Sequence, residues 1–159
     1  MNRKKYHIFC DESCLTHRYS CYGDVIISNN TLDMVNNTIN AVRKEQTLFA
    51  ELKWSKISNQ YNDKYEILIN HVASLINKDM LHFRSIIIDN HKINYTKYSN
   101  GDKEIGLYKF YFQLLKHCFL KNANNAEYEI YIDQRITNII SMICKIILIM
   151  SSSLLKLHQ

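Results

Sequence analysis

The sequence predicts an α/β fold in which helices pack on the faces of a mixed sheet. Two strand-like segments lie close together near the N-terminus, which predicts an antiparallel hairpin. Strands and helices alternate in the later half of the chain, and that order is typical of parallel strands joined by helical crossovers. The chain has 159 residues, of which 47% are hydrophobic, so we expect residues 1–159 to form a single domain.

Four strands are predicted from runs of apolar residues or from their alternation with polar ones. They cover residues 5–11, 22–28, 81–89 and 128–133. The first segment places Tyr6, Ile8 and Cys10 on one face and the residues between them on the other. All but the second of these strands end in aspartate.

Helices are predicted where apolar residues recur at spacings of three and four. They cover residues 31–46, 59–77, 103–120 and 137–155. Asn30 and Thr31 are residue types that cap the N-terminus of a helix. A polar loop is expected over residues 90–102, and residues 51–54 fit either a short strand or an extended loop.

Composition limits the classes of function. The chain carries 20 Lys and Arg against 15 Asp and Glu, and its net charge of +5 is compatible with a polyanionic partner such as nucleic acid. It has no proline and three glycines, and none of the glycines fits a P-loop or a dinucleotide-binding fingerprint. We therefore expect neither ATP nor NAD chemistry of those kinds.

The sequence predicts a cytoplasmic protein that does not enter a membrane. The basic N-terminus is not followed by the apolar segment of a signal peptide, so the five cysteines are expected to be reduced thiols. The most apolar stretch, residues 139–150, contains Lys145 and falls short of the roughly 18 residues that a membrane helix needs.

Acidic residues at strand ends are the main candidate for chemistry. Asp11, Asp89 and Asp133 each close a predicted strand, and Glu12 follows the first of them. If these strands run parallel, their carboxylates lie along one edge of the sheet, where open α/β sheets place their sites. Carboxylates that lie close together bind Mg²⁺ or Mn²⁺. Such ions can activate water and stabilise the leaving oxygen in phosphodiester cleavage. The alternative is that aspartate ends strands because it favours turns, and Asp89 before Asn90 fits this reading best.

Other polar residues are ambiguous from spacing alone. Glu51 and Lys53 would share a face on a strand, whereas in a loop they would be solvated charges. The three N-terminal cysteines are spaced too irregularly for a standard zinc knuckle, and buried or idle thiols are the better interpretation for Cys10, Cys14 and Cys21. His17, in the loop after the first acidic pair, is either a general acid or base or an ordinary surface histidine.

Three short motifs, in order, resemble those of the family labelled domain of unknown function 3800. They are Ile8-Phe9-Cys10-Asp11-Glu12-Ser13, Glu51-Leu52-Lys53 and Ile130-Tyr131-Ile132-Asp133, which together span most of the chain. The resemblance implies an RNase-H-like fold with an acidic metal centre drawn from Asp11, Glu51 and Asp133. It also implies a nuclease activity, which is itself inferred from the fold for this family.

Two functions follow. The first is a Mg²⁺- or Mn²⁺-dependent nuclease for RNA or DNA, in which Asp11, Glu51 and Asp133 hold the metal, Asp89 or Glu12 assists, and Lys53 steadies a phosphate oxygen. The second is a degenerate RNase-H-like binding module, whose apolar C-terminal helix docks a protein partner or forms a homodimer.

Departures from the family pattern motivate the second function. The family carries an acid in a C-terminal helix, but no Asp or Glu follows Asp133 in this sequence, so the chain is either incomplete at that end or altered. Cys14 also stands where the family has a glycine. A zinc protein that uses the N-terminal cysteines is the third and weakest possibility.

Overall fold

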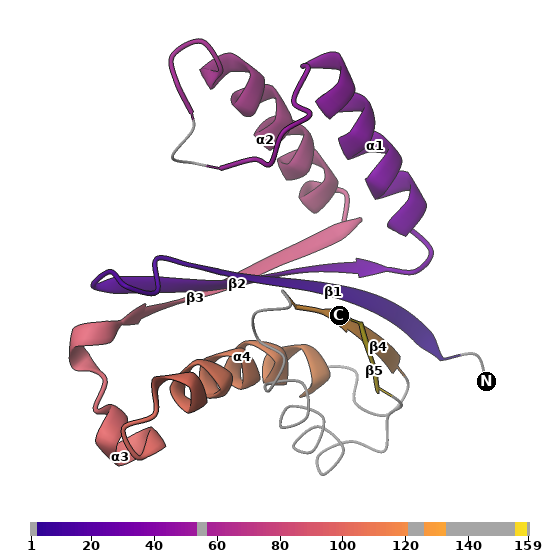
Figure 1. Ribbon diagram of the computed structural model, residues 1–159. Coiled ribbons are helices and arrows are strands. Elements are labelled where there is room, and N and C mark those ends of the chain that lie inside the picture. Colours follow the sequence, from indigo (N-terminus) through magenta and orange to yellow (C-terminus); the bar gives the residue numbers. More distant parts are fainter. Residues whose placement is uncertain (1–2, 54–56, 121–125, 133–154, 159) are drawn as a thin grey trace. The chain divides into compact units, whose positions relative to one another are not determined.

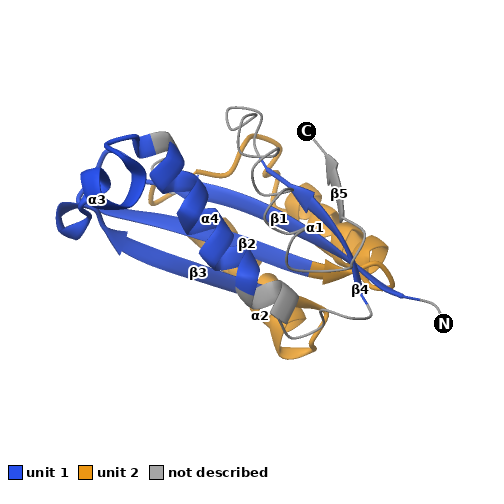
Figure 2. Ribbon diagram, turned by 90° about the horizontal axis from the view of Figure 1, so that it is seen from below, with its two compact units in different colours: residues 1–26, 83–159 blue, residues 27–82 orange. Residues whose placement is uncertain are grey.

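The computed structural model describes residues 3–53, 57–120, 126–132 and 155–158 (Figure 1). It divides into two compact units, which Figure 2 distinguishes by colour. The first unit comprises Met1–Ile26 and Phe83–Gln159, and the second comprises Ile27–His82. The predicted α/β class with a mixed sheet is confirmed, whereas a single domain over the whole chain stays a prediction.

A five-stranded sheet runs through the structure in the order β3-β2-β1-β4-β5. Its strands are β1 (Lys4–Ser13), β2 (Tyr19–Ser28), β3 (Leu81–Asp89), β4 (Ala126–Tyr131) and β5 (Leu155–His158). Three helical elements separate β3 from β4, namely the 3₁₀-helix η2 (Asn90–Lys92), α3 (Tyr95–Ser99) and α4 (Lys103–Leu120). The segment between β3 and β4 thus forms a helical crossover of the predicted kind.

The strand directions follow from their pairing. β1 pairs in parallel with β4, and β4 pairs in parallel with β5. β2 must run against β1, because the five residues between these neighbours are too few for a parallel crossover. β2 also runs antiparallel to β3. Just before β2, the Arg18 carbonyl accepts a hydrogen bond from Asn90 N–H just after β3, at 2.7 Å. Six residues later, Asp24 accepts a hydrogen bond from Arg84, six residues before Asn90, so the two strands advance in opposite directions. β1, β3 and β4 therefore point the same way.

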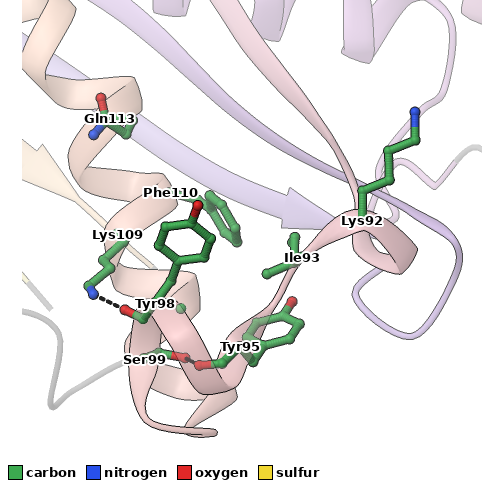
Figure 3. Close-up of a pocket in the computed structure, with 9 residues that line it drawn as sticks. Lys92, Ile93, Tyr95, Tyr98, Ser99, Lys109, Phe110 and Gln113 are labelled. Atoms are coloured by element: carbon green, nitrogen blue, oxygen red, sulfur yellow. Dashed lines mark hydrogen bonds between the residues drawn. The ribbon is translucent and has the colours of Figure 1, made fainter.

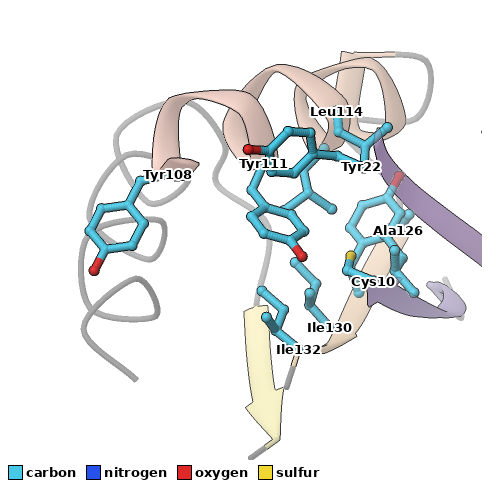
Figure 4. Packing of buried hydrophobic residues seen from close by; sticks show 11 residues of the cluster. Cys10, Tyr22, Tyr108, Tyr111, Leu114, Ala126, Ile130 and Ile132 are labelled. Carbon is cyan, nitrogen blue, oxygen red and sulfur yellow. The ribbon is translucent and has the colours of Figure 1, made fainter. Parts of the chain in front are cut away.

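The core of the first unit lies between the sheet and α4 (Figure 4). β1 contributes Ile8 and Cys10 from one face, as the alternation predicted, and Ile130 lies beside Ile8 on β4. From α4, Tyr111 is fully buried and meets the Tyr22 ring edge-on, at 5.4 Å between centroids. Tyr108 and Leu115, three residues before and four residues after Tyr111, are buried as well, which fits the predicted helical spacing.

The described residues of the second unit include the helices α1 (Leu32–Glu45) and α2 (Asn62–Asn77). Val42 and Leu68 pack together with Leu48 from the following loop, and Ile39 and Tyr65 are partly buried against them. Ile39 and Val42 on α1, and Tyr65 and Leu68 on α2, lie at the helical spacing that the sequence predicted. Burial of such an amphipathic stripe stabilises a helix more than propensity does.

Several boundaries differ from the sequence prediction. The expected loop over residues 90–102 contains η2 and α3. Asn94 caps α3 by accepting a hydrogen bond from Lys97 N–H at 3.0 Å, and Asn100 and Gly101 end it in the left-handed region. Most of the helix predicted over residues 137–155 lies outside the described residues, and its last position, Leu155, begins a strand that the sequence did not predict.

A matched pair of isoleucines tests the core. Ile130 is fully buried in β4 and Ile87 is 69% exposed in β3. We expect Ile130→Ala to lower the free energy of unfolding by about 2–5 kcal/mol, because it removes buried methyl groups and leaves a cavity. Ile87→Ala should cost well under half as much. Urea denaturation of both variants measures the difference, and equal losses would contradict this account of the core.

Candidate functional site

The candidate site lies at the carboxyl edge of the sheet in the first unit. β1 and β3 both end there, at Ser13 and Asp89, because the two strands run in the same direction. β2 lies between them, so the strands are two spacings apart, about 9–10 Å. Asp11 and Asp89 thus lie at the same edge, as predicted, but on strands that do not neighbour each other.

Asp11 and Glu12 point to opposite faces of β1. Asp11 is exposed and lies on the same face as His7 and Phe9, and its Oδ1 accepts a hydrogen bond from the Glu12 backbone N–H at 2.9 Å. Glu12 faces the core, where its Oε2 accepts a hydrogen bond from the Tyr111 hydroxyl. Burial and this bond to Glu12 raise the pKa of Tyr111, which keeps the hydroxyl neutral as a donor.

Asp89 is held by structural contacts. Its Oδ1 accepts a hydrogen bond from His91 N–H at 3.1 Å, which caps η2, and its Oδ2 lies 3.4 Å from Arg18 Nη2. Burial alone would raise the pKa of the Asp89 carboxyl, but the bonds from Arg18 and His91 outweigh it and lower that pKa. One carboxylate oxygen is therefore engaged by the turn that follows β3, and the other by Arg18, which precedes β2.

Glu51, Lys53 and His17 are the other candidate residues that the structure describes, and all three are exposed. Glu51 and Lys53 belong to the second unit, in an extended loop and not a strand, and both are exposed. They pair with each other, with Lys53 Nζ 2.9 Å from Glu51 Oε2. Asp133 lies outside the described residues. His17 is an exposed turn residue whose carbonyl accepts a hydrogen bond from the Asn90 amide at 2.8 Å.

Within residues 3–53, 57–120, 126–132 and 155–158, no three His, Cys, Asp or Glu side chains are grouped closely enough to hold an ion. None of the helices described in these ranges combines the length and the apolar character needed to cross a membrane.

A buried polar cluster on β1 and β4 escaped the sequence prediction. His7 and Glu129 are register partners and are 5% and 7% exposed. Glu129 Oε1 lies 2.8 Å from Lys5 Nζ, and its Oε2 lies 3.2 Å from both His7 Nδ1 and the Tyr131 hydroxyl. The Lys5 bond is the main reason that the pKa of Glu129 falls to about 2. The available signal was the alternation that places Lys5 and His7 on one face of β1, and Glu127 and Glu129 on one face of β4.

A second buried charge pair lies between β2 and β3. The Asp24 side chain is fully buried, and Arg84 donates to both of its carboxylate oxygens at 3.4 Å. Such a fork-shaped contact satisfies a carboxylate that would be costly to bury alone. Its position within the paired strands indicates a structural role.

A cavity of about 340 Å³ opens beside α3 and α4, also in the first unit (Figure 3). Its walls include Ile93 and the rings of Tyr95, Tyr98 and Phe110. The sequence prediction missed this cavity because it treated residues 90–102 as loop.

Comparisons of the chain with family models, with curated proteins and with solved structures find no match.

The turn after Asp11 yields a first prediction for this region. Cys14 is exposed and has φ = 60°, in the left-handed region that costs most non-glycine residues about 1–2 kcal/mol. Cys14→Gly should therefore raise the free energy of unfolding by about 0.5–1 kcal/mol. Ser13→Gly, in the extended last position of β1, should lower it. Chemical denaturation of the two variants in parallel measures both signs, and destabilisation by Cys14→Gly would contradict the prediction.

The buried cluster yields a second prediction, on acid stability. The pKa of Glu129 is about 2 in the folded chain against an ordinary value of 4.5, so its contribution to stability is present above about pH 4.5 and is lost as pH falls toward 2. Glu129→Gln should be less stable than the parent near neutral pH, and its stability should fall less on acidification. Thermal melts from about pH 7 to about pH 3 measure this, with exposed Glu66→Gln as control. Parallel pH profiles for parent and Glu129→Gln would refute it.

Proposed function

We propose that this chain is a metal-dependent phosphodiesterase that cleaves RNA or DNA at the carboxyl edge of β1 and β4. The observation that carries the proposal is the exposed Asp11 near the end of a strand that pairs in parallel with β4. The register pairs Phe9 with Tyr131, and Asp11 and Asp133 each follow these partners by two residues in the sequence.

The sheet supports an RNase-H-like interpretation. The sheet is mixed and begins with the expected N-terminal antiparallel hairpin, since β2 alone among the first four strands is reversed. Cys14 offers independent support for the family resemblance, because it adopts the positive φ that suits the glycine found there in the family. Fold analogy alone does not establish an activity, so the proposal rests on the acidic edge.

In the proposed site, Asp11 and Asp133 would hold Mg²⁺ or Mn²⁺, for which carboxylate oxygens are suitable hard ligands, and the family resemblance assigns Glu51 as a third ligand. The bound ion would activate water and neutralise charge at the leaving oxygen. Lys53 would bind a phosphate oxygen of the substrate. Its exposed ammonium now pairs with Glu51, and it would leave that carboxylate to contact the phosphate. Asp89 is the weaker candidate ligand, because Arg18 and His91 already engage its two oxygens.

A binding module without cleavage is the second candidate. The specific observation is that no Asp or Glu follows Asp133 in the sequence, which leaves the acid set smaller than the resemblance implies. In this case the chain would bind nucleic acid, or it would bind a protein partner or a second copy of itself through residues 139–155, most of which lie outside the described residues. Light scattering that shows a strict monomer would count against the homodimer.

Metal binding by calorimetry decides between the candidates. We expect Mn²⁺ or Mg²⁺ to bind the parent, and Asp11→Asn to abolish both this binding and the cleavage of labelled RNA and DNA, because it removes a charged ligand at the edge. Asp79→Asn is the matched control, since Asp79 is exposed and its φ of 58° is one that asparagine also adopts readily. Absence of metal binding in the parent would overturn the nuclease and favour the binding module. Cleavage by Asp11→Asn at the parent rate would exclude Asp11 from the site.

A further inference from the structure

The proposed nuclease function assigns no role to the aromatic cavity of the first unit. Its volume of about 340 Å³ falls at the lower end of the range for small-ligand pockets, about 300–1,000 Å³. Tyr95, Tyr98 and Phe110 present rings from two different helices around it (Figure 3). A cavity of this size and lining suits a single planar ring system.

Local contacts preform the cavity. Gly106 on α4 lies so close to Tyr95 that an added Cβ would come within 2.7 Å of the ring. The Tyr95 carbonyl accepts a hydrogen bond from Ser99 Oγ at 2.9 Å, and Lys109 on α4 donates to the Tyr98 carbonyl. α3 is thus fastened to α4 at both of its tyrosines, which fixes the walls before any ligand arrives.

The charge of the lining selects an anionic ligand. Lys92 and Lys109 belong to the lining, and no acidic residue does. Lys97 adds a third ammonium, 5.5 Å from the centre of the Tyr98 ring. Lys92 extends away from the rings in Figure 3, so its ammonium would meet a group outside the cavity and not the planar group within it. A base joined to a backbone phosphate has this combination of a planar ring and an external negative charge.

The position of the cavity connects it with the acidic edge. Lys92 and Ile93 come three and four residues after Asp89, the last residue of β3, and β1 carries Asp11 to the same edge of the sheet. A strand that places one base in the cavity would therefore leave along the edge at which the proposed cleavage occurs. Only an unpaired base can enter such a cavity, because a base within a duplex is stacked on its neighbours.

We propose that this cavity holds one base of a single-stranded nucleic acid, between Tyr98 and the other rings, with Lys92 on the adjoining phosphate. The proposal rests on the proposed function for its substrate class, but it concerns binding and needs no metal. Tyr98 is the best residue to test, because its side chain is 58% exposed and its loss should not disturb the core.

Fluorescence anisotropy in EDTA tests this site separately from cleavage. The probes are labelled oligo(U), oligo(dT) and a duplex, each of about ten nucleotides, which is within the usual span of single-strand sites. The full chain should bind at least one of the two single strands more tightly than the duplex. Tyr98→Ala should weaken that binding by about five- to hundredfold, the range that loss of one base–aromatic stack produces, and Tyr98→Phe should retain it.

Two further variants sharpen the result. Tyr61→Ala is the matched control, since Tyr61 is also exposed and also has a lysine 5.5 Å from its ring centre, but it lies in the second unit. It should bind as the parent does. Lys92→Gln should reduce the slope of log K against log salt by about 0.7, as expected for the loss of one phosphate contact on a single strand.

The outcomes separate this proposal from the nuclease. Parent-like binding by Tyr98→Ala, equal binding of the duplex, or no binding of either single strand would overturn the base site, whatever the cleavage assay shows. Binding that depends on Tyr98 supports the base site even if the parent binds no metal and cuts nothing. Circular dichroism of each variant confirms that it is folded.

Discussion

The parallel pairing of β1 with β4 is the constraint on which the rest of the first unit depends, because parallel neighbours cannot be joined by a short turn. The chain must cross from one end of the sheet to the other between them, and α4 does so while covering one face. Tyr111 fastens this helix at two points, packing on Tyr22 and bonding to Glu12 near the end of β1. The same crossover begins with η2 and α3, which is why the aromatic cavity lies close to the edge that carries Asp11.

The pairing also explains how charged groups are tolerated inside the sheet. The register places His7 beside Glu129 and Phe9 beside Tyr131. Glu129 therefore has His7 of β1 and Tyr131 of β4 as polar neighbours while its backbone stays paired in the sheet. The low pKa of Glu129 shows that these neighbours, Lys5 foremost, more than compensate for its burial. The chain thus keeps an apolar layer against α4 and a polar layer on the other face of the same two strands.

Sequence patterns predicted the elements whose signals are local. The apolar run that forms β3 and the stripe that forms α4 were placed correctly to the residue, since neither needs knowledge of its neighbours. α3 was missed although Asn94 and Asn100 mark its two ends, because it is too short to show a period. Asp11 was predicted to close the first strand, and the structure continues that strand by two residues to Ser13. The engagement of Asp89 by Arg18, 71 residues away, depends on tertiary contacts that no local pattern contains. The alternation on β1 and β4 hinted at polar faces, but the Glu129 cluster was missed because it depends on the register that pairs His7 with Glu129.

The strict alternation along β1 divides the strand into two sets of positions that natural variation can change independently. Substitutions at Ile8 and Cys10 act through packing against α4, whereas those at His7 and Asp11 act through charge on the opposite face. Insertion of one residue before His7 would exchange the two sets, burying the acid and exposing the core. Homologous chains should therefore vary in length in the loops beside β1 and keep the spacing within it.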